Sequence, residues 1–234
     1  MLEVNQLNTF YGEFQALHDV SLKVNDGEFV VVFGPNGHGK STLLKTICGL
    51  LTPASGSIKF DGEELSTLPT KKLVEMGIVY IAEDRHLFPQ LSVLNNLRLG
   101  AYSAKAWPRE AENLEHVFQL FPKLKEFANR RAETLSGGEA RMLAIGRGLM
   151  SDAKFLAIDE PSFGLAPNLR LEVFERIKEI NRSGVTVLMV EQDVIEASEY
   201  ADRIYLMEDG RIVFQGNREE VMSNEYVKEV FLGL

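Results

Sequence analysis

The chain has 234 residues, a formal net charge of −9 and 45% apolar residues, which suits one large domain or a core with a sizeable insertion. Its single cysteine, Cys48, excludes a disulfide framework and favours a reducing, cytoplasmic setting. The acidic balance argues against a broad nucleic-acid surface, so we expect no nucleic acid among its partners.

Continuous apolar stretches in the sequence are short. Examples are FVVVF (29–33) and VTVLMV (185–190), both far below the roughly 20 residues that a membrane-spanning helix needs. Strand-like sequence begins directly after Met1, which predicts no signal peptide. We therefore expect any membrane role to run through a partner.

The first 24 residues alternate apolar and polar side chains, and NDG (25–27) is a turn signal, so an antiparallel β element is expected. Later apolar runs are typical of strands buried on both faces of a parallel sheet; they are FVVVF, GIVYI (77–81), FLAI (155–158) and VTVLMV. Helical spacing in 40–50 and 168–184 separates them, with Gly49 and Gly184 where helices would end. The sequence predicts an α/β fold.

The pattern changes between about residue 84 and residue 147, where amphipathic helices dominate. One apolar face precedes the helix break at Pro122; it consists of Leu114, Val117, Phe118 and Phe121. We interpret 84–147 as a helical subdomain inserted between the two parts of one core, 1–83 and 148–234. In the second part, residues 203–216 predict a hairpin that turns at Asp209-Gly210.

The segment GPNGHGKS (34–41) fits the pattern G-x-x-x-x-G-K-[ST] between a predicted strand and a predicted helix. Its glycines let backbone N–H groups surround a β-phosphate, and Lys40 adds a full charge towards the β- and γ-oxygens. Ser41 is placed to bind Mg²⁺. A turn that binds nothing is the alternative, and a side chain at the variable position of His38 tends to face outward. The expected ATP-binding residues here are Gly34, Pro35, Asn36, Gly37, His38, Gly39, Lys40, Ser41 and Thr42.

A nucleoside triphosphate also needs a second Mg²⁺ anchor and a group that orients water. Asp159 and Glu160 end the apolar strand in KFLAIDEPS (154–162). Asp159 can join the metal shell, and Glu160 can act as the general base. The alternative is that two acids merely end a strand in solvent, but their pairing with the phosphate loop favours catalysis.

The segment LSGGEARMLAIGRGLM (135–150) lies shortly before that strand. Ser136 followed three residues later by Glu139 predicts a capping box, with Gly137 and Gly138 relaxing the turn. A helix start with exposed N–H groups is equally an anion site. This segment therefore either caps a helix or also holds a phosphate.

The order of phosphate loop, helical insertion, LSGGE and IDEP resembles the ATP-binding subunits of ABC transporters across essentially the whole chain. The resemblance implies a P-loop NTPase (RecA-like) core with an N-terminal antiparallel β subdomain and an inserted α-helical subdomain. It implies a head-to-tail pair in which Ser136, Gly137, Gly138 and Glu139 serve the partner's nucleotide, and SFGLAP (162–167) crosses the interface. Tyr11 in FYG matches the aromatic that stacks on adenine, although it could instead pack on the sheet.

Longer stretches are most similar to the LivF-type ATPase of branched-chain amino-acid importers; they are FYGEFQALHDVSL, LAIGRGLM, DEPSFGLAP, VEQD and the final FLGL. This implies ATP hydrolysis at the inner face of a cell membrane, powering uptake of leucine, isoleucine and valine through two permease subunits served by a substrate-binding protein. Urea and short-amide importers share much of the pattern. A soluble ABC ATPase acting in translation or chromosome work and a non-hydrolysing regulator are further alternatives.

Two positions depart from the general family pattern: Glu83 replaces a Mg²⁺-contacting glutamine, and Gln192 replaces a switch histidine. Glutamate can bind a hard cation, whereas glutamine can hydrogen-bond a γ-phosphate but carries no positive charge. Alternatively, Gln192 merely precedes a capping box made by Asp193 and Glu196. We expect a heteromeric pair whose second ATPase supplies the histidine-bearing site; a homodimer is the alternative.

The segment 85–97 connects the phosphate side of the predicted core to the helical insertion. Its apolar residues Leu87, Phe88 and Leu91 have two interpretations. They either line a groove that receives a coupling helix of the membrane subunit or pack in an ordinary core.

Overall fold

The computed structural model describes residues 1–229, so the final FLGL lies outside the described residues. The strands are β1 (Leu2–Tyr11), β2 (Phe14–Val24), β3 (Phe29–Phe33), β4 (Ser55–Phe60), β5 (Glu63–Glu64), β6 (Ile78–Ile81), β7 (Phe155–Asp159), β8 (Thr186–Glu191), β9 (Arg203–Glu208) and β10 (Arg211–Gly216). The α-helices are α1 (Lys40–Ile47), α2 (Thr70–Glu75), α3 (Val93–Gly100), α4 (Glu110–Leu120), α5 (Pro122–Glu126), α6 (Gly137–Leu149), α7 (Pro167–Arg182), α8 (Val194–Ser198), α9 (Arg218–Ser223) and α10 (Glu225–Val227). Short 3₁₀ helices are η1 (Trp107–Arg109) and η2 (Ala132–Thr134).

The described strands form two sheets, which confirms the predicted α/β class with an antiparallel N-terminal element. The antiparallel sheet has the order β2-β1-β4-β5. The larger sheet has the order β10-β9-β3-β8-β7-β6 and is parallel apart from the hairpin β9-β10. The central position of β3 brings the carboxyl end of this strand beside those of β8 and β9, where open α/β sheets bind ligands.

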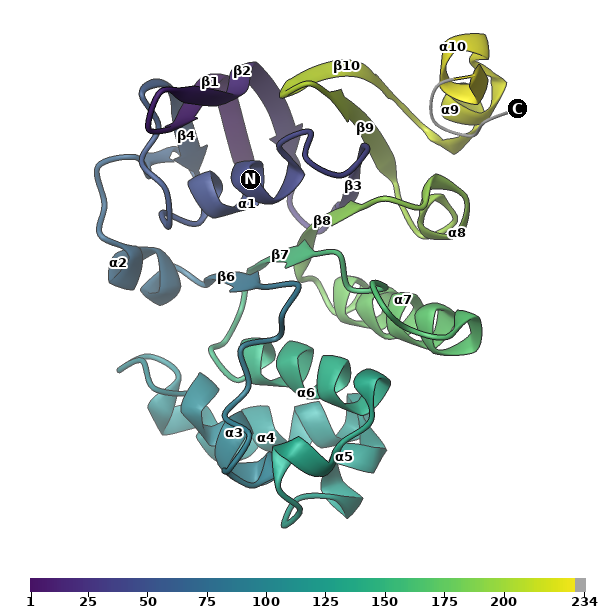
Figure 1. Cartoon of the computed structure of the whole chain (residues 1–234). Coiled ribbons are helices and arrows are strands. Elements are labelled where there is room, and N and C mark those ends of the chain that lie inside the picture. Colours follow the sequence, from purple (N-terminus) through teal and green to yellow (C-terminus); the bar gives the residue numbers. More distant parts are fainter. Residues whose placement is uncertain (230–234) are drawn as a thin grey trace.

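Strand β3 is buried on both faces, as its unbroken apolar run predicts. Val30 and Val32 pack with α1 and the antiparallel sheet, whereas Phe29, Val31 and Phe33 pack with the helices on the opposite face. Figure 1 shows α1 between the two sheets and α7 below the larger one. The period of two along a strand therefore generates two separate cores from one sheet.

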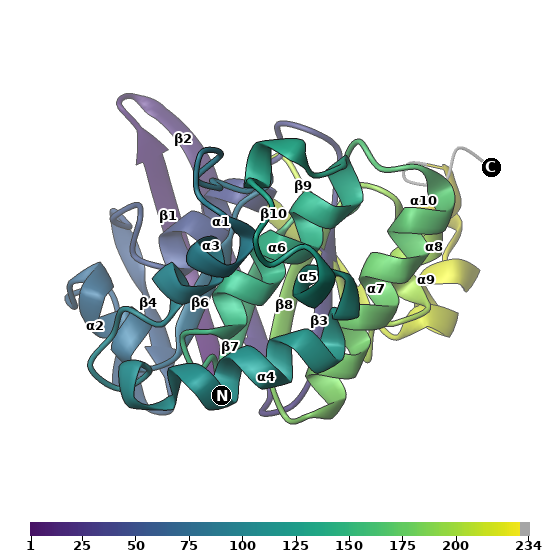
Figure 2. The ribbon, with the colours of Figure 1, turned by 90° about the horizontal axis from the view of Figure 1, so that it is seen from below.

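The helices α3 to α6 lie together beyond the larger sheet, and Figure 2 views the molecule from their side. Of the predicted apolar face, Val117 and Phe121 are buried, and Leu114 and Phe118 pack against the same core. Helix α6 ends at Leu149, two residues beyond the predicted boundary at 147. Within residues 1–229, no helix has the length and apolarity to cross a membrane.

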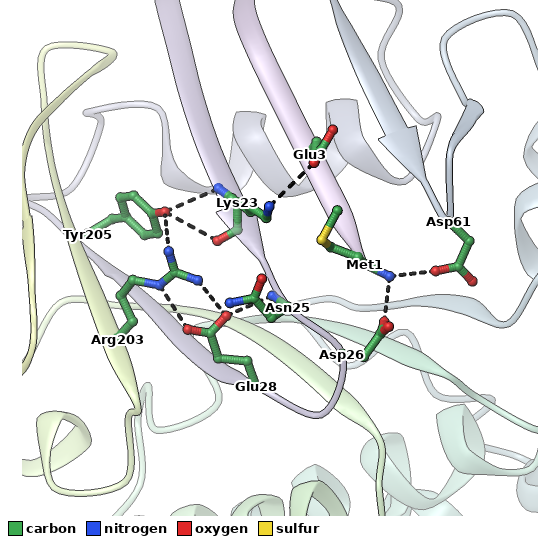
Figure 3. A network of polar contacts seen from close by, with 9 residues as sticks. All are labelled: Met1, Glu3, Lys23, Asn25, Asp26, Glu28, Asp61, Arg203 and Tyr205. Atoms are coloured by element: carbon green, nitrogen blue, oxygen red, sulfur yellow. Dashed lines mark hydrogen bonds and ion pairs between the residues drawn. The ribbon is translucent and has the colours of Figure 1, made fainter.

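A network of polar contacts joins the antiparallel sheet to β9 (Figure 3). The hydroxyl of Tyr205 accepts a hydrogen bond from the backbone N–H of Lys23 at 3.1 Å and donates one to its carbonyl oxygen at 3.2 Å. Arg203 Nε donates to Glu28 Oε1 at 2.8 Å. The network fixes the connection between β2 and β3, and therefore the entry into the strand that carries the phosphate loop.

Candidate functional site: the cavity at the end of β3

The loop between β3 and α1 folds back around the side chain of Lys40. Lys40 Nζ donates to the carbonyl oxygens of Gly34 at 2.8 Å and Pro35 at 3.1 Å, and the residue is 3% exposed. Gly39 has a φ of 97°, and a Cβ there would lie 2.9 Å from the carbonyl oxygen of Ala16. Only glycine suits that position, so the sequence dictates a tight turn with its lysine facing inward.

Lys40 meets Glu160 in the interior. The distance from Lys40 Nζ to Glu160 Oε1 is 3.1 Å, and both side chains are nearly buried. Glu160 follows β7 in a left-handed conformation with a φ of 40°, which costs free energy in a residue with a Cβ and is concentrated at functional sites. Its backbone N–H donates to Val190 of β8 at 3.1 Å. The sheet register therefore holds this acid over the phosphate loop.

Asp159 contacts Ser41 and Tyr80. Ser41 Oγ donates to Asp159 Oδ1 at 2.9 Å, and the hydroxyl of Tyr80 on β6 donates to Asp159 Oδ2 at 2.7 Å. Tyr80 was not singled out from the sequence, since nothing local marks it. The two hydrogen bonds orient the carboxylate beside the serine hydroxyl, as the predicted metal set requires.

A cavity of about 310 Å³ adjoins the phosphate loop; it is lined by Asn36, Gly37, Gly39, Lys40, Ser41, Thr42, Glu83, Glu160 and Phe163. Burial raises the pKa of Glu83 above its ordinary value, and the nearby carboxylates of Glu160 and Asp159 raise it further. The structure therefore brings together the phosphate loop with the acids that sequence reasoning placed beside it.

The oxygen ligands in this cavity fit Mg²⁺. A serine hydroxyl and carboxylates are hard donors, and clustered negative charge favours a cation. Among residues 1–229, no group of three or more His, Cys, Asp or Glu side chains could hold a metal by itself. Mg²⁺ usually takes one or two protein ligands together with substrate phosphates and water.

Tyr11 lies at the end of β1, close to the start of α1. Thr42 Oγ1 donates to its hydroxyl at 3.4 Å, and the residue is 47% exposed. The neighbouring aromatic Phe14 is 68% exposed and was missed from the sequence, where it resembles any strand residue. Exposed aromatic faces beside a phosphate loop suit the stacking of a base.

His38 directs its side chain away from the cavity. Its Nδ1 accepts a hydrogen bond from the backbone N–H of Asp209 at 2.9 Å, and its carbonyl oxygen accepts one from Gly210 at 3.1 Å. Asp209 and Gly210 have positive φ values of 45° and 72°, so they form the predicted tight turn of β9-β10. The side chain of His38 therefore fastens the loop to this hairpin and does not line the phosphate cavity.

A second cavity of about 430 Å³ adjoins the first and shares Glu160 and Phe163 with it; Gln192 also lines it. Before Gln192, Glu191 is buried: Oε1 accepts from the N–H of Ser162 at 2.9 Å, and Oε2 from that of Gln192 at 3.2 Å. Burial raises the pKa of Glu191 to about 7. The burial of this acid was not predicted from the sequence, because polar Gln192 and Asp193 follow it directly.

Asp193 caps α8 as predicted, accepting from the N–H groups of Ile195 at 3.0 Å and Glu196 at 3.5 Å. The second half of the expected capping box is wrong. Glu196 pairs instead with Arg170 of α7 at 3.1 Å. A nearby guanidinium offers a carboxylate a stronger, charge-assisted partner than a backbone N–H does.

Ser136 and Glu139 form the predicted capping box of α6. Ser136 N–H donates to Glu139 Oε2 at 2.8 Å, and Glu139 N–H donates to Ser136 Oγ at 3.4 Å. The hydrogen bond from Ser136 lowers the pKa of Glu139. Ser136, Gly138 and Glu139 line a separate cavity of about 50 Å³. Within one chain, then, this helix start and the phosphate loop line different cavities.

A groove of about 740 Å³ lies between the parallel sheet and the helices α3 and α6. Phe88 is 50% exposed and lines it. Leu87 packs partly buried against the core, and Leu91 does not line the groove. Of the three predicted groove residues, the structure therefore places one there.

The site consists of a glycine-rich loop around a lysine, a helix that follows the loop, and acids at the end of a parallel strand that face it. This arrangement defines a P-loop ATPase. The ABC transporter family model matches residues 17–163, and the chain belongs to this family, whose members bind and hydrolyse ATP. The chain is 46% identical over 233 residues to the high-affinity branched-chain amino acid transport ATP-binding protein BraG of Pseudomonas aeruginosa, covering 100% of both chains.

The chain is also 36% identical over 235 residues to the probable branched-chain amino acid transport ATP-binding protein LivF of Archaeoglobus fulgidus, covering 100% of this chain and 99% of the relative. The crystal structure of a nucleotide-free ATP-binding cassette from an ABC transporter matches with a TM-score of 0.88 and 28% identity, covering 100% and 99% of the two chains. These similarities confirm the family and the ATPase class predicted from the motifs.

Proposed function

We propose that this chain is the ATP-hydrolysing subunit of an importer of branched-chain amino acids. The observation that carries the proposal is the meeting of Lys40, Glu160 and Ser41 in one cavity, with Asp159 hydrogen-bonded to Ser41, in a chain similar along its whole length to BraG. The cavity supports ATP hydrolysis as the reaction, and the similarity to BraG supports branched-chain amino acids as the substrate class.

In this proposal each group of the cavity has a separate role. Lys40 interacts with the β- and γ-phosphates, and Glu160 accepts the proton of the attacking water. Ser41, Asp159 and Glu83 would hold Mg²⁺, which when bound neutralises charge on the phosphate oxygens. Gln192 would hydrogen-bond a γ-phosphate oxygen from the adjoining cavity. Tyr11 would stack on the adenine ring.

The proposed working unit contains two ATPase chains. Ser136 and Glu139 lie at a helix start, a favourable anion site, yet they share no cavity with the phosphate loop of their own chain. A head-to-tail pair would bring this helix start to the nucleotide of the partner. Because Gln192 lacks a charge, we propose that a different, histidine-bearing ATPase subunit is the partner.

The proposed membrane connection is the groove that contains Phe88. Its lining is mostly apolar, and Leu50, Leu99 and Tyr102 are exposed beside Phe88, which suits the apolar face of a helix from a permease subunit. In this arrangement two permease subunits hold the chain at the inner face of the membrane, and a substrate-binding protein acts upstream of them.

Uptake measurements test the substrate. Cells that lack the chain are supplied with labelled leucine or labelled urea and are restored with wild type or Lys40→Ala. Loss of leucine uptake that only wild type restores is the expected result. Loss of urea uptake alone would move the chain to the importers of urea and short amides, and no change in either would contradict a role in import of these solutes.

A further inference from the structure

Two arginines of α6 bind the backbone of the segment that follows β6, which we call the 82–88 loop. Arg141 donates from Nη1 to the carbonyl oxygen of Ala82 at 3.1 Å and from Nη2 to that of Glu83 at 2.8 Å. Arg147 donates from Nη1 to the carbonyl oxygen of His86 at 2.7 Å and from Nη2 to that of Arg85 at 3.1 Å. One helix therefore holds the start and the middle of the loop.

The loop is strained at the two residues that Arg147 binds. Arg85 and His86 have φ values of 66° and 44°, and consecutive left-handed residues with a Cβ cost free energy that the surroundings must compensate. Arg147 binds the carbonyl oxygens of these two residues, and Arg141 binds two carbonyl oxygens shortly before them. Arg141 is fully buried, and its guanidinium remains charged because burial lowers its pKa only to about 10. Charge-assisted bonds of this kind are stronger than neutral ones.

The loop runs between two cavities. Glu83 lines the ATP cavity, whereas Arg85, His86 and Phe88 line the groove. At the other end of α6, a methyl group on Gly137 would lie 3.7 Å from Arg85 Nη2. Arg141 and Arg147 therefore connect α6 to the loop. The side chain of Arg85 in turn extends from the loop towards the start of α6.

We propose that Arg141 and Arg147 are positioning residues that hold the 82–88 loop in its strained conformation, which sets Glu83 at the ATP cavity and makes the loop move with α6. Arg141 acts through Glu83, and Arg147 fixes the residues of the loop that line the groove. Arginine is needed because its planar guanidinium reaches two carbonyl oxygens at once, whereas a lysine ammonium is a single point charge. The inference rests on the proposed role of Glu83.

Hydrogen exchange of the full chain tests the clamp in Arg141→Lys and Arg147→Lys. The matched control is Arg109→Lys, an exposed arginine paired with Glu112 and Asp152. Because each lost hydrogen bond is worth about 1 kcal/mol, or roughly fivefold in an opening equilibrium, we expect exchange across residues 82–88 to rise about fivefold in both clamp variants and not in the control. Equal exchange in all four proteins, with unchanged thermal unfolding, would overturn the clamp.

The Mg²⁺ concentration at half-maximal ATP hydrolysis tests the action through Glu83. We expect Arg141→Lys to raise it severalfold, and to raise it no further in a Glu83→Ala background. An additive effect in the double variant would overturn the action through Glu83. If Glu83→Ala alone leaves the Mg²⁺ dependence unchanged, the proposed role of Glu83 fails, and the exchange experiment still decides the clamp separately.

Discussion

At the scale of single residues, Glu160 is the side chain on which we propose that turnover depends. Its carboxylate faces the cavity and lies 3.1 Å from Lys40 Nζ, and its backbone strain is compensated by the sheet. Glu160→Gln keeps the shape and the hydrogen-bonding oxygen but cannot accept a proton. We expect phosphate release at saturating ATP to fall about 10²- to 10⁴-fold, with ATP binding retained because the phosphate loop is intact.

The matched control for Glu160→Gln is Glu175→Gln, an exposed position on α7. Both variants should bind ATP with similar affinity in an equilibrium titration, and only Glu160→Gln should lose turnover. If Glu160→Gln hydrolyses ATP at the wild-type rate, Glu160 is not the base.

Glu191 gives the free energy of unfolding a dependence on pH. Its pKa is about 7 in the folded chain against 4.5 for the free group, because burial disfavours the carboxylate. The folded state therefore binds more protons between these values, and stability falls as pH rises through this window. The expected loss is on the order of 2 kcal/mol between pH 4.5 and pH 7.

Glu191→Gln removes this titration, so denaturant unfolding between pH 5 and pH 7 should show a flatter slope than the wild type. The variant also loses one of the two acceptors that serve Ser162 and Gln192, so its stability should be lower at every pH, and the slope is the readout. Parallel curves for wild type, Glu191→Gln and the control Glu175→Gln would contradict the assignment.

At the scale of elements, the contact between β2 and β9 holds the antiparallel sheet against the larger sheet (Figure 3). Tyr205 is 2% exposed, and its hydroxyl satisfies both backbone groups of Lys23. Tyr205→Phe keeps the ring and leaves those groups without their partner. We expect a loss of about 1–3 kcal/mol in the free energy of unfolding, measured by denaturant titration.

The control for this element is Tyr102→Phe, since Tyr102 is 61% exposed. Its hydroxyl can therefore hydrogen-bond with water in both the folded and the unfolded chain. This control should change stability by less than about 0.5 kcal/mol. Equal stability of Tyr205→Phe and wild type would mean that this hydroxyl does not help to hold the sheets together.

At the scale of the whole molecule, the parts readable from sequence are those whose cause is local. FVVVF is a buried strand because five apolar residues in a row need burial on both faces, and the phosphate loop follows from glycines and a lysine within eight positions. Ser136 and Glu139 formed their box because both partners lie in one helical turn.

Contacts between distant segments that no motif marks were not readable. Tyr80 reaches Asp159 across 79 positions, and His38 reaches Asp209 across 171. Arg141 binds Ala82 across 59 positions, although in sequence it reads as one more charge on a helix. Such pairings depend on strand order and on which helix covers which face of the sheet, so they emerge only once the chain is folded.

The phosphate loop and the start of α6 line different cavities within one chain, which favours a pair of chains, and the uncharged Gln192 leads to the last prediction, that this pair is heteromeric. In vesicles with the permease subunits, we expect the purified chain alone to remain below the full substrate-stimulated turnover that a second ATPase subunit restores. Complementation provides the control, using Lys40→Ala and Gly137→Asp.

Gly137 has room for a side chain, since an added Cβ would meet only ordinary contacts at 3.5 and 3.7 Å, and an aspartate there would repel the partner's phosphates. In a head-to-tail homodimer, a mixture of the two inactive variants contains one intact composite site per mixed dimer, so activity would return. A heteromeric pair contains only one copy of this chain. Each variant therefore leaves a damaged site that the other variant cannot restore. We therefore expect the mixture to stay inactive without the second subunit, because a glutamine at position 192 carries no charge to the γ-phosphate in either half of a homodimer.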